Sequence, residues 1–114
     1  MQKEEIMNHF MAELRRGNLI LTVLSQLDKP EYGYSLIHKM QENQIEVDSN
    51  TLYPLMRRLE TQGLLMSKVQ IIQEKPRKYY QRTPLGDEVY QELLDQWRKL
   101  NQNIEKLIGG KEDE

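Results

Sequence analysis

Apolar positions recur at intervals of three and four residues over most of the chain, and this periodicity predicts a mainly helical protein. Pro30 and the polar residues beside it separate the first helical stretch from the second. Thr83 and Pro84 form a typical helix start, because Thr caps a helix and Pro suits its first turn. The expected helices span residues 4–27, with a break near Gly17, then 34–43, 50–62 and 84–108.

Two stretches between the third and fourth helices are rich in Val, Ile and Tyr, which favours strands. Residues 66–73 and 77–82 are expected to form a hairpin around Glu74-Lys75-Pro76. Three helices, a hairpin and a last helix predict a mainly α fold with a small β-hairpin, a winged helix-turn-helix with an added C-terminal helix. The expected organisation is a winged helix-turn-helix unit over residues 1–83, a separate C-terminal helix over 84–108 and a disordered tail over 109–114.

The third helix has one apolar stripe and a marked beginning and end. Pro54 is expected in its first turn, where most backbone N–H groups lack an intrahelical partner. Gly63 is expected to supply the left-handed residue that ends the helix. The apolar positions are Leu52, Leu55, Met56 and Leu59, and the candidate N-caps are Ser49, Asn50 and Thr51.

The opposite face of this helix is polar and cationic, which is typical of helices that enter the major groove of DNA. Asn50 and Thr51 lie at its tip, and at least one of Arg57 and Arg58 is expected to reach a base or a phosphate. Both arginines could also be ordinary surface residues. Tyr53 is either a half-buried aromatic residue or a hydroxyl that donates to a phosphate near the helix N-terminus, where the helix dipole favours an anion.

Positive charge is concentrated in the expected hairpin, although the whole chain has a net charge of −2. Residues 68–82 contain five basic residues and one acid, a local charge of +4. Phosphate binding responds to such a local patch rather than to the total. Tyr34, at the start of the second helix, either supports a phosphate contact or packs after the preceding turn. The expected hairpin contacts to phosphate are Lys75, Arg77 and Lys78, whose alternative role is to keep the hairpin soluble.

Three groups of short motifs follow one another along residues 15–86. The first is Gly17-Asn18-Leu19-Ile20-Leu21 with Tyr32-Gly33-Tyr34, the second is Thr51-Leu52-Tyr53-Pro54-Leu55 with Arg58-Leu59-Glu60 and Gly63-Leu64-Leu65, and the third is Arg77-Lys78-Tyr79-Tyr80 with Thr83-Pro84-Leu85-Gly86. In this order and spacing they resemble the PadR family of bacterial transcription regulators. Asn50 stands where members often carry Gly. The resemblance implies a DNA-binding repressor and favours the phosphate contact for Tyr53.

The last helix carries an apolar seam with alternating spacings of three and four residues, as in a coiled coil. The seam could cover its own domain. However, it is long for so small a domain and charged residues flank it, so a homodimer through this helix is expected. A dimer also suits DNA, because two recognition helices one helical turn apart read a two-fold site. The seam consists of Tyr90, Leu93, Trp97, Leu100, Ile104 and Leu107.

Trp97 is the only tryptophan and lies in the middle of this seam, where a large indole packs poorly. The chain resembles a small PadR subfamily with multidrug-binding regulators, in which two such indoles flank a flat aromatic ligand at the dimer interface. The matching pocket here would combine Trp97 with Leu93, Asn101, Arg15 and Leu19. Asn101 replaces an acid found in some relatives and Arg15 adds positive charge, so both argue against a cationic ligand. The alternative is that Trp97 is dimer-core packing.

Other classes of protein fit the sequence less well. The chain has no Cys, no phosphate-cradling Gly loop and no His-carboxylate spacing typical of a catalytic or metal site, so no enzyme and no cofactor are expected. No apolar run reaches membrane-spanning length and the N-terminus is not a signal peptide, so a cytoplasmic protein is expected. The remaining alternatives are a winged-helix protein–protein module without DNA binding and a MarR-type regulator.

Overall fold

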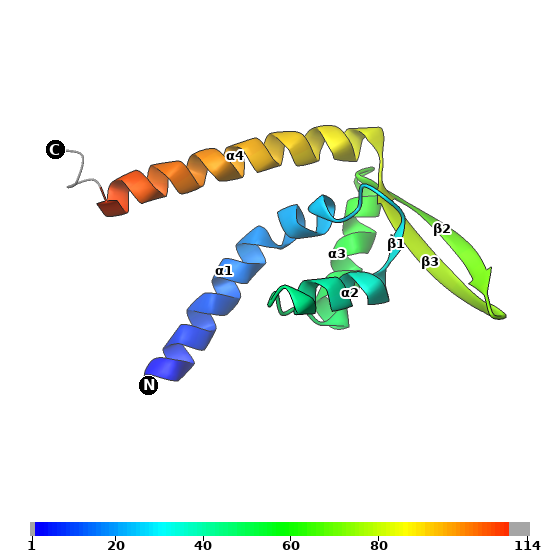
Figure 1. Ribbon diagram of the computed structural model, residues 1–114, viewed down its shortest axis with the longest axis horizontal. Helices are drawn as coiled ribbons and strands as arrows, with labels where there is room; N and C mark the ends of the chain where they lie inside the picture. The colour runs from blue at the N-terminus through cyan, green and yellow to red at the C-terminus, as the bar shows by residue number, and fades with distance from the viewer. Residues whose placement is uncertain (1, 110–114) are drawn as a thin grey trace.

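The computed structural model describes residues 2–109 (Figure 1). This part of the chain contains four helices and a three-stranded antiparallel sheet with the strand order β1-β3-β2, which confirms the mainly helical fold with a β-hairpin. Helices α2 and α3 form the helix-turn-helix, and β2 and β3 form the wing. The elements are α1 (Lys3–Ser25), β1 (Glu31–Tyr32), α2 (Gly33–Glu42), α3 (Ser49–Thr61), β2 (Leu65–Ile72), β3 (Lys75–Arg82) and α4 (Pro84–Gly109).

Helix α1 is continuous, so the expected break near Gly17 was wrong. A glycine inside a helix costs only about 1 kcal/mol relative to alanine, and the neighbouring residues are good helix formers. A Cβ at Gly17 would meet nothing within 4 Å, so no close approach requires the glycine there. The described part of α4 ends at Gly109, one residue later than expected, and the expected tail at 110–114 lies outside the described residues.

The N-cap of α3 is Asp48, not one of the three residues that follow it. Its carboxylate accepts a hydrogen bond of 2.8 Å from the backbone N–H of Thr51. The helix therefore begins at Ser49, and Pro54 lies in the second turn rather than the first. Pro54 removes the N–H that would bond the carbonyl of Asn50, but Asn50 is exposed and water can satisfy that carbonyl.

The end of α3 is a Schellman motif, as the sequence predicted from Gly63. Gly63 has a φ of 82°. Its N–H bonds the carbonyl of Glu60 at 2.9 Å, and the N–H of Leu64 bonds the carbonyl of Leu59 at 2.9 Å. This motif turns the chain directly into β2.

The hairpin turn is Gln73-Glu74, not Glu74-Lys75-Pro76. Both turn residues have positive φ, 53° and 64°, which is the backbone of a tight two-residue hairpin. Pro76 lies opposite Ile71, next to the pair of Ile72 and Lys75 that closes the hairpin. At this position the backbone N–H of β3 would point away from β2, so proline removes no hydrogen bond between the two strands. The two-residue strand β1 gave no sequence signal and pairs with Tyr79 and Tyr80 of β3.

The hydrophobic core lies between α1, α2, α3 and the base of the hairpin. Tyr80 is the buried member of the Tyr79-Tyr80 pair, as expected from their opposite orientations. In α2, Leu36 and Met40 are buried and Ile37 is half-buried. The buried apolar residues are Val23, Leu24, Leu27, Leu36, Met40, Leu52, Leu55, Met56, Leu59, Leu65 and Tyr80.

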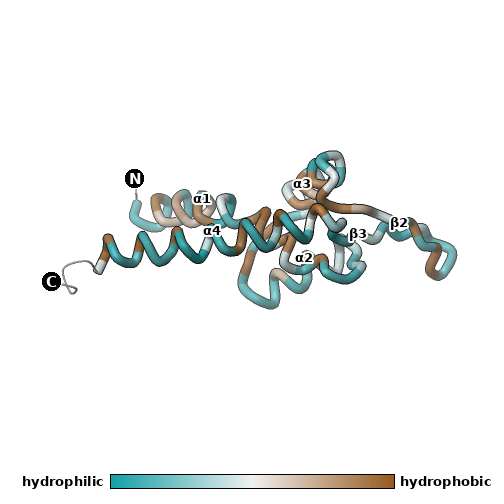
Figure 2. The backbone as a smooth tube through the Cα atoms, turned by 90° about the horizontal axis from the view of Figure 1, so that it is seen from above, coloured by the Kyte–Doolittle hydropathy of each residue, from teal (hydrophilic) through white to brown (hydrophobic). Residues whose placement is uncertain are grey.

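The first half of α1 and most of α4 project from this core as two long arms that diverge in a V (Figure 1). Apolar positions recur along both arms in Figure 2. Among them, Phe10 is 54% exposed, Leu14 61% and Leu100 57%. The core of the described chain therefore does not cover the apolar faces of the arms.

The junction between β3 and α4 is tightly built. Thr83 caps α4 as predicted, because its hydroxyl accepts from the N–H of Gly86 at 2.9 Å and donates to the carbonyl of Gly63 at 2.6 Å. A Cβ on Gly86 would overlap the carbonyl oxygen of Leu64. The first turn of α4 is thus held directly against the C-terminal end of α3.

Gly86→Ala tests this close approach. The added methyl group must push α4 away from the Leu64 carbonyl, so we expect the free energy of unfolding to fall by about 1–3 kcal/mol in urea denaturation. Gly17→Ala is the matched control, because the same change in open space should raise the stability by about 0.5–1 kcal/mol. Equal effects of the two substitutions would show that the junction is loose.

Candidate nucleic-acid interface

The exposed face of α3 carries the polar residues that the sequence assigned to DNA. Asn50 and Thr51 are exposed in its first turn, and Arg57 and Arg58 are exposed one to two turns later. Within residues 2–109 neither arginine takes part in an ion pair. The buried stripe of α3 fixes this orientation, because it packs into the core and leaves the polar residues outward.

Tyr53 is half-buried in α3. Its ring lies against Gly33, the first residue of α2, and a Cβ at Gly33 would overlap the ring. The cap residue of α2, Tyr32, makes no side-chain hydrogen bond to the N–H groups of the first turn. The Tyr53 hydroxyl therefore lies beside a helix N-terminus that can accept an anion.

Tyr34 lies on the outer surface of α2 and is 61% exposed. Its ring contacts His38 edge to face, with the ring centroids 4.5 Å apart. This contact links two exposed side chains one turn apart and does not bury either of them. Tyr34 is thus available near the start of α2, on the same helix end that meets Tyr53.

The three wing residues that were expected to contact phosphate, Lys75, Arg77 and Lys78, lie in different surroundings. Lys75 is exposed beside the turn. Arg77 lies over the ring of Tyr32, with 5.4 Å from Cζ to the ring centroid, and the Tyr32 ring meets Tyr79 edge to face. These aromatic contacts hold the Arg77 side chain along the outer face of the sheet.

The side chain of Lys78 contacts α3. Its Nζ lies 3.5 Å from a carboxylate oxygen of Glu60 and 5.2 Å from the centroid of the Tyr80 ring. The neighbouring Tyr80 side chain, more than the charge of Glu60, raises the pKa of Lys78 above its ordinary value. Glu60 also accepts a 2.5 Å hydrogen bond from the hydroxyl of Ser67. The wing is thus fastened to the end of the recognition helix, a role of Glu60 that the sequence did not indicate.

Arg82, which contributes to the positive run in the sequence, is not part of the exposed surface. Its side chain is 10% exposed, and its Nε lies 2.7 Å from a carboxylate oxygen of Asp87. It also donates to the carbonyl of Leu24 at 2.5 Å, and its guanidinium lies 4.5 Å from the centroid of the Tyr90 ring. The positive surface is therefore smaller than the sequence count of +4 suggested, because Arg82 and Lys78 are engaged within the protein.

In residues 2–109, the five residues of the expected ligand pocket do not share either of two surface cavities. Trp97 donates its indole N–H to Asn18 of α1 at 2.8 Å and lines a cavity of about 380 Å³. Arg15 and Leu19 line a separate cavity of about 720 Å³ between α1 and the loop before α3. Leu93 and Asn101 line neither of these two cavities.

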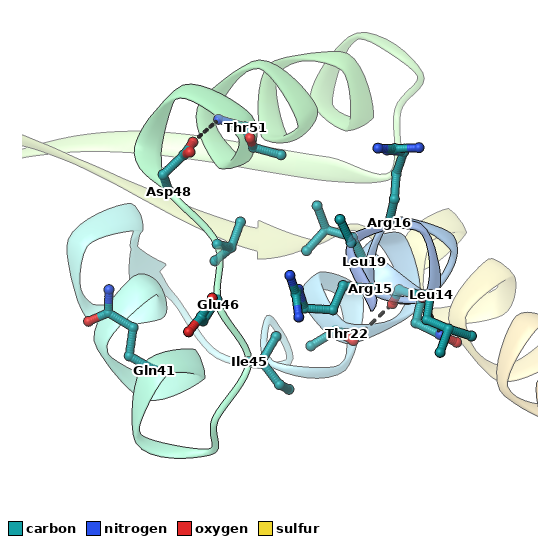
Figure 3. A pocket seen from close by; sticks show the side chains of 13 residues that line it. Leu14, Arg15, Arg16, Leu19, Thr22, Gln41, Ile45, Glu46, Asp48 and Thr51 are labelled. Atoms are coloured by element: carbon teal, nitrogen blue, oxygen red, sulfur yellow. Dashed lines mark hydrogen bonds between the residues drawn. The ribbon is translucent and has the colours of Figure 1, made fainter. Parts of the chain in front are cut away.

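Figure 3 shows the larger cavity, into which Arg15 points from α1. Ile45 and Glu46 lie opposite it on the loop between α2 and α3, and Asp48 and Thr51 lie at the start of α3. The lining is mixed, with apolar walls and charges of both signs. A group bound here would touch both an arm and the segment that begins the recognition helix.

The PadR-like family of transcriptional regulators matches residues 20–92 of the chain. This match covers more than half of the sequence, including the core, the wing and the start of α4. The chain belongs to the PadR-like family. The family is one of transcriptional regulators rather than of enzymes, and its members bind DNA. In residues 2–109, no helix is both long enough and apolar enough to span a bilayer.

Similar proteins support this assignment. The chain is 30% identical to the transcriptional regulator Rv3488 of Mycobacterium tuberculosis over 101 residues, 88% of this chain and 92% of that protein. A PadR family regulator from Eggerthella lenta shares 47% identity, with a TM-score of 0.88 over 92% of this chain and 94% of that one. A PadR-like transcription factor from Bacteroides fragilis shares 32% identity, with a TM-score of 0.73 over 87% and 98% of the two chains.

Gly33→Ala tests the packing of Tyr53 on α2 in this PadR-like protein. The new methyl group must displace the ring, so we expect DNA affinity to fall at least as far as in Tyr53→Phe, which removes only the hydroxyl. Loss of one hydrogen bond to a charged group corresponds to about 1.5–3 kcal/mol of binding free energy. Fluorescence anisotropy with labelled duplex DNA measures both variants. If neither substitution lowers the affinity, Tyr53 is only a packing residue.

Proposed function

We propose that a homodimer of this chain binds a two-fold DNA operator and represses transcription. The observation that carries the proposal is the exposed face of α3, where Arg57 and Arg58, which have no ion-pair partner within residues 2–109, lie on the same helix as the exposed Asn50 and Thr51. Membership of the PadR-like family supports the DNA-binding role. Repression follows from the resemblance, since an operator-bound dimer excludes the transcription machinery from the same DNA.

The DNA contacts divide between bases and phosphates. Arg57 and Arg58 on α3 have the length and donor geometry to reach base edges in the major groove. Asn50 and Thr51 approach the DNA from the N-terminal tip of α3. Tyr53, with the first turn of α2, contacts a phosphate and fixes the register of the helix. Lys75 and Arg77 contact phosphates of the DNA backbone outside the part of the major groove that α3 occupies. Lys78 contributes mainly by holding the wing.

The dimer forms through the seam of α4. Trp97 is 41% exposed, Ile104 42% and Leu107 85%, because α1 of the same chain covers only part of this stripe. A second copy of α4 buries it and places two copies of α3 on one face of the assembly. The continuous apolar spacing along the helix supports a helical partner rather than a loop.

A planar aromatic effector binds near Trp97 in this proposal and releases the operator. The indole N–H is already bonded to Asn18, so the ring offers a ligand its π face. The neutral Asn101, one turn after Trp97 on α4, supplies no negative charge and so favours a ligand without positive charge. Saturable quenching of the single tryptophan by planar neutral compounds, absent in a dimeric Trp97→Phe variant, tests this part. Absence of quenching at micromolar concentration refutes it.

Salt dependence tests the assignment of the wing. Lys75→Ala should lower the slope of log K against log salt by about 0.9, the value for one lost phosphate contact. Lys78→Ala should change the slope less, because Glu60 already neutralises that ammonium group. Lys99→Ala, on α4 and paired with Asp95, is the control and should leave the slope unchanged. An unchanged slope in Lys75→Ala would remove the wing from the phosphate contact. Absence of salt-sensitive binding to duplex DNA by the purified protein would favour a protein–protein module instead.

Two charged substitutions test the dimer. Leu100→Asp with Ile104→Asp places two carboxylates in the seam, so we expect a monomer by analytical ultracentrifugation and weaker DNA binding, because the two half-sites lose their linkage. Gln102→Asp adds a charge at an outward heptad position and should leave a dimer. A dimeric double variant would place the interface elsewhere.

A further inference from the structure

The larger surface cavity, of about 720 Å³, lies between α1 and the loop that joins α2 to α3 (Figure 3). Its volume is in the range of sites that hold small molecules, roughly 300–1,000 Å³. Figure 3 shows α4 on the other side of α1, and Trp97 lines the smaller cavity rather than this one. One wall is a single face of α1, whose residues recur at intervals of three and four: Ala12, Arg15, Leu19 and Thr22.

The guanidinium group of Arg15 enters this cavity without a charged partner. Arg15 is half-buried and points from α1 toward the loop (Figure 3). Within residues 2–109 it forms no ion pair. Arginine stays charged and carries several N–H donors, and a carboxylate matches them with two parallel hydrogen bonds. The α1 wall therefore offers a place for a carboxylate group.

The opposite wall carries the opposite charge. Glu46 lies across the cavity from Arg15, yet no ion pair joins the two side chains (Figure 3). Asp48 also lines the cavity, but its carboxylate already accepts the N–H of Thr51 as the cap of α3. Glu46 is thus the carboxylate on this wall that is left for a cation.

Apolar side chains line the same cavity. Leu19 on α1 and Ile45 and Val47 on the loop pack against the core, and all three are half-buried. Each keeps part of its apolar surface uncovered, so a ligand with apolar groups would gain by covering it. A simple anion suits this cavity poorly, because it would face Glu46 and leave the apolar walls uncovered.

We propose that this cavity binds a zwitterion with an apolar body, of the size of a short peptide with free ends. Its carboxylate pairs with Arg15, and its ammonium group pairs with Glu46. Both contacts are charge-assisted hydrogen bonds, which are stronger in a partly desolvated place than in water. The apolar side chains of the peptide cover the three half-buried aliphatic residues. The site is formed within one chain, so it does not depend on the proposed DNA binding.

Trileucine and three matched compounds test the site by isothermal titration calorimetry with the wild-type protein. We expect saturable binding of trileucine. N-acetyl-trileucine lacks the ammonium group and trileucine amide lacks the carboxylate, so each should bind about tenfold more weakly, as expected for loss of a hydrogen bond to a charged group. Leucine has both charges but should also bind more weakly than trileucine, because it covers less of the apolar wall.

Two substitutions assign the two ends of the peptide. Arg15→Gln should bind trileucine and its amide equally, and Glu46→Gln should bind trileucine and its N-acetyl form equally, because each variant removes one charge of the protein. Arg98→Gln on α4 and Glu42→Gln at the end of α2 are the matched controls, since neither residue lines the cavity, and both should keep the wild-type preferences. If the wild type binds none of the compounds, or binds the blocked peptides as tightly as trileucine, the inference fails while the proposed DNA binding stands.

The place of binding is tested in the dimer. Trileucine should slow amide hydrogen exchange in residues 12–22 and 43–51, and a dimeric Trp97→Phe variant should still bind it. If binding is lost in that variant but kept in Arg15→Gln, the peptide occupies the seam of α4 and the inference is wrong. If only the monomeric Leu100→Asp, Ile104→Asp variant binds trileucine, the partner chain covers the cavity in the dimer, which also overturns the inference.

Discussion

The close approach of α4 to the end of α3 is the constraint on which the rest of the molecule depends. Gly86 leaves room for the Leu64 carbonyl, and the hydroxyl of Thr83 bonds both helix ends. Arg82 adds bonds to Leu24 of α1 and Asp87 of α4. Three helices and the wing therefore meet at one small junction. A change in direction of α4 cannot be absorbed there by a flexible loop, so it must move the recognition helix as well.

The single chain leaves much of the apolar surface of its two arms uncovered. Its core lies between residues 23 and 80, and most of the apolar side chains outside that range remain exposed on the two arms. A small core supports only marginal stability, and burial of the arms by a second copy would add to it. In our proposal the same burial sets the distance between two recognition helices. Stability and operator geometry would then depend on the same contacts.

The sequence predicted the elements well where periodicity or a capping residue marks them. The stripe of α3, the left-handed Gly63 and the Thr83-Pro84 start of α4 were all readable from local patterns. The N-cap of α3 was missed because four consecutive polar residues can each cap a helix. Packing of the apolar stripe of α3 into the core determines that Asp48 is the cap. The turn was misplaced because proline usually marks a turn, whereas here Pro76 occupies a strand position that needs no N–H.

The interface was predictable in its residue types but not in its electrostatics. Charge counting cannot show that Lys78 pairs with Glu60 or that Arg82 bonds Leu24 and Asp87 at the junction, because these partners come from other elements of the fold. The role of Gly33 was equally invisible, since it depends on the ring of Tyr53 from the next helix. Contacts of this kind arise only when separate elements meet.

The junction also determines how an effector near Trp97 would act. Trp97 bonds Asn18, so it joins α4 to α1 about four turns from the junction, at 3.6 residues per turn. In our proposal, a ligand stacked on this indole would change the angle between the arms, and the rigid junction would turn that change into a rotation of α3. Two recognition helices must fit half-sites about 34 Å apart, so a small rotation lowers the affinity of both. By linkage, operator DNA then lowers the ligand affinity by the same factor. In our proposal, a protein with a loose junction would bind the ligand without this reciprocity, so the rigidity around Gly86 would serve regulation as well as stability.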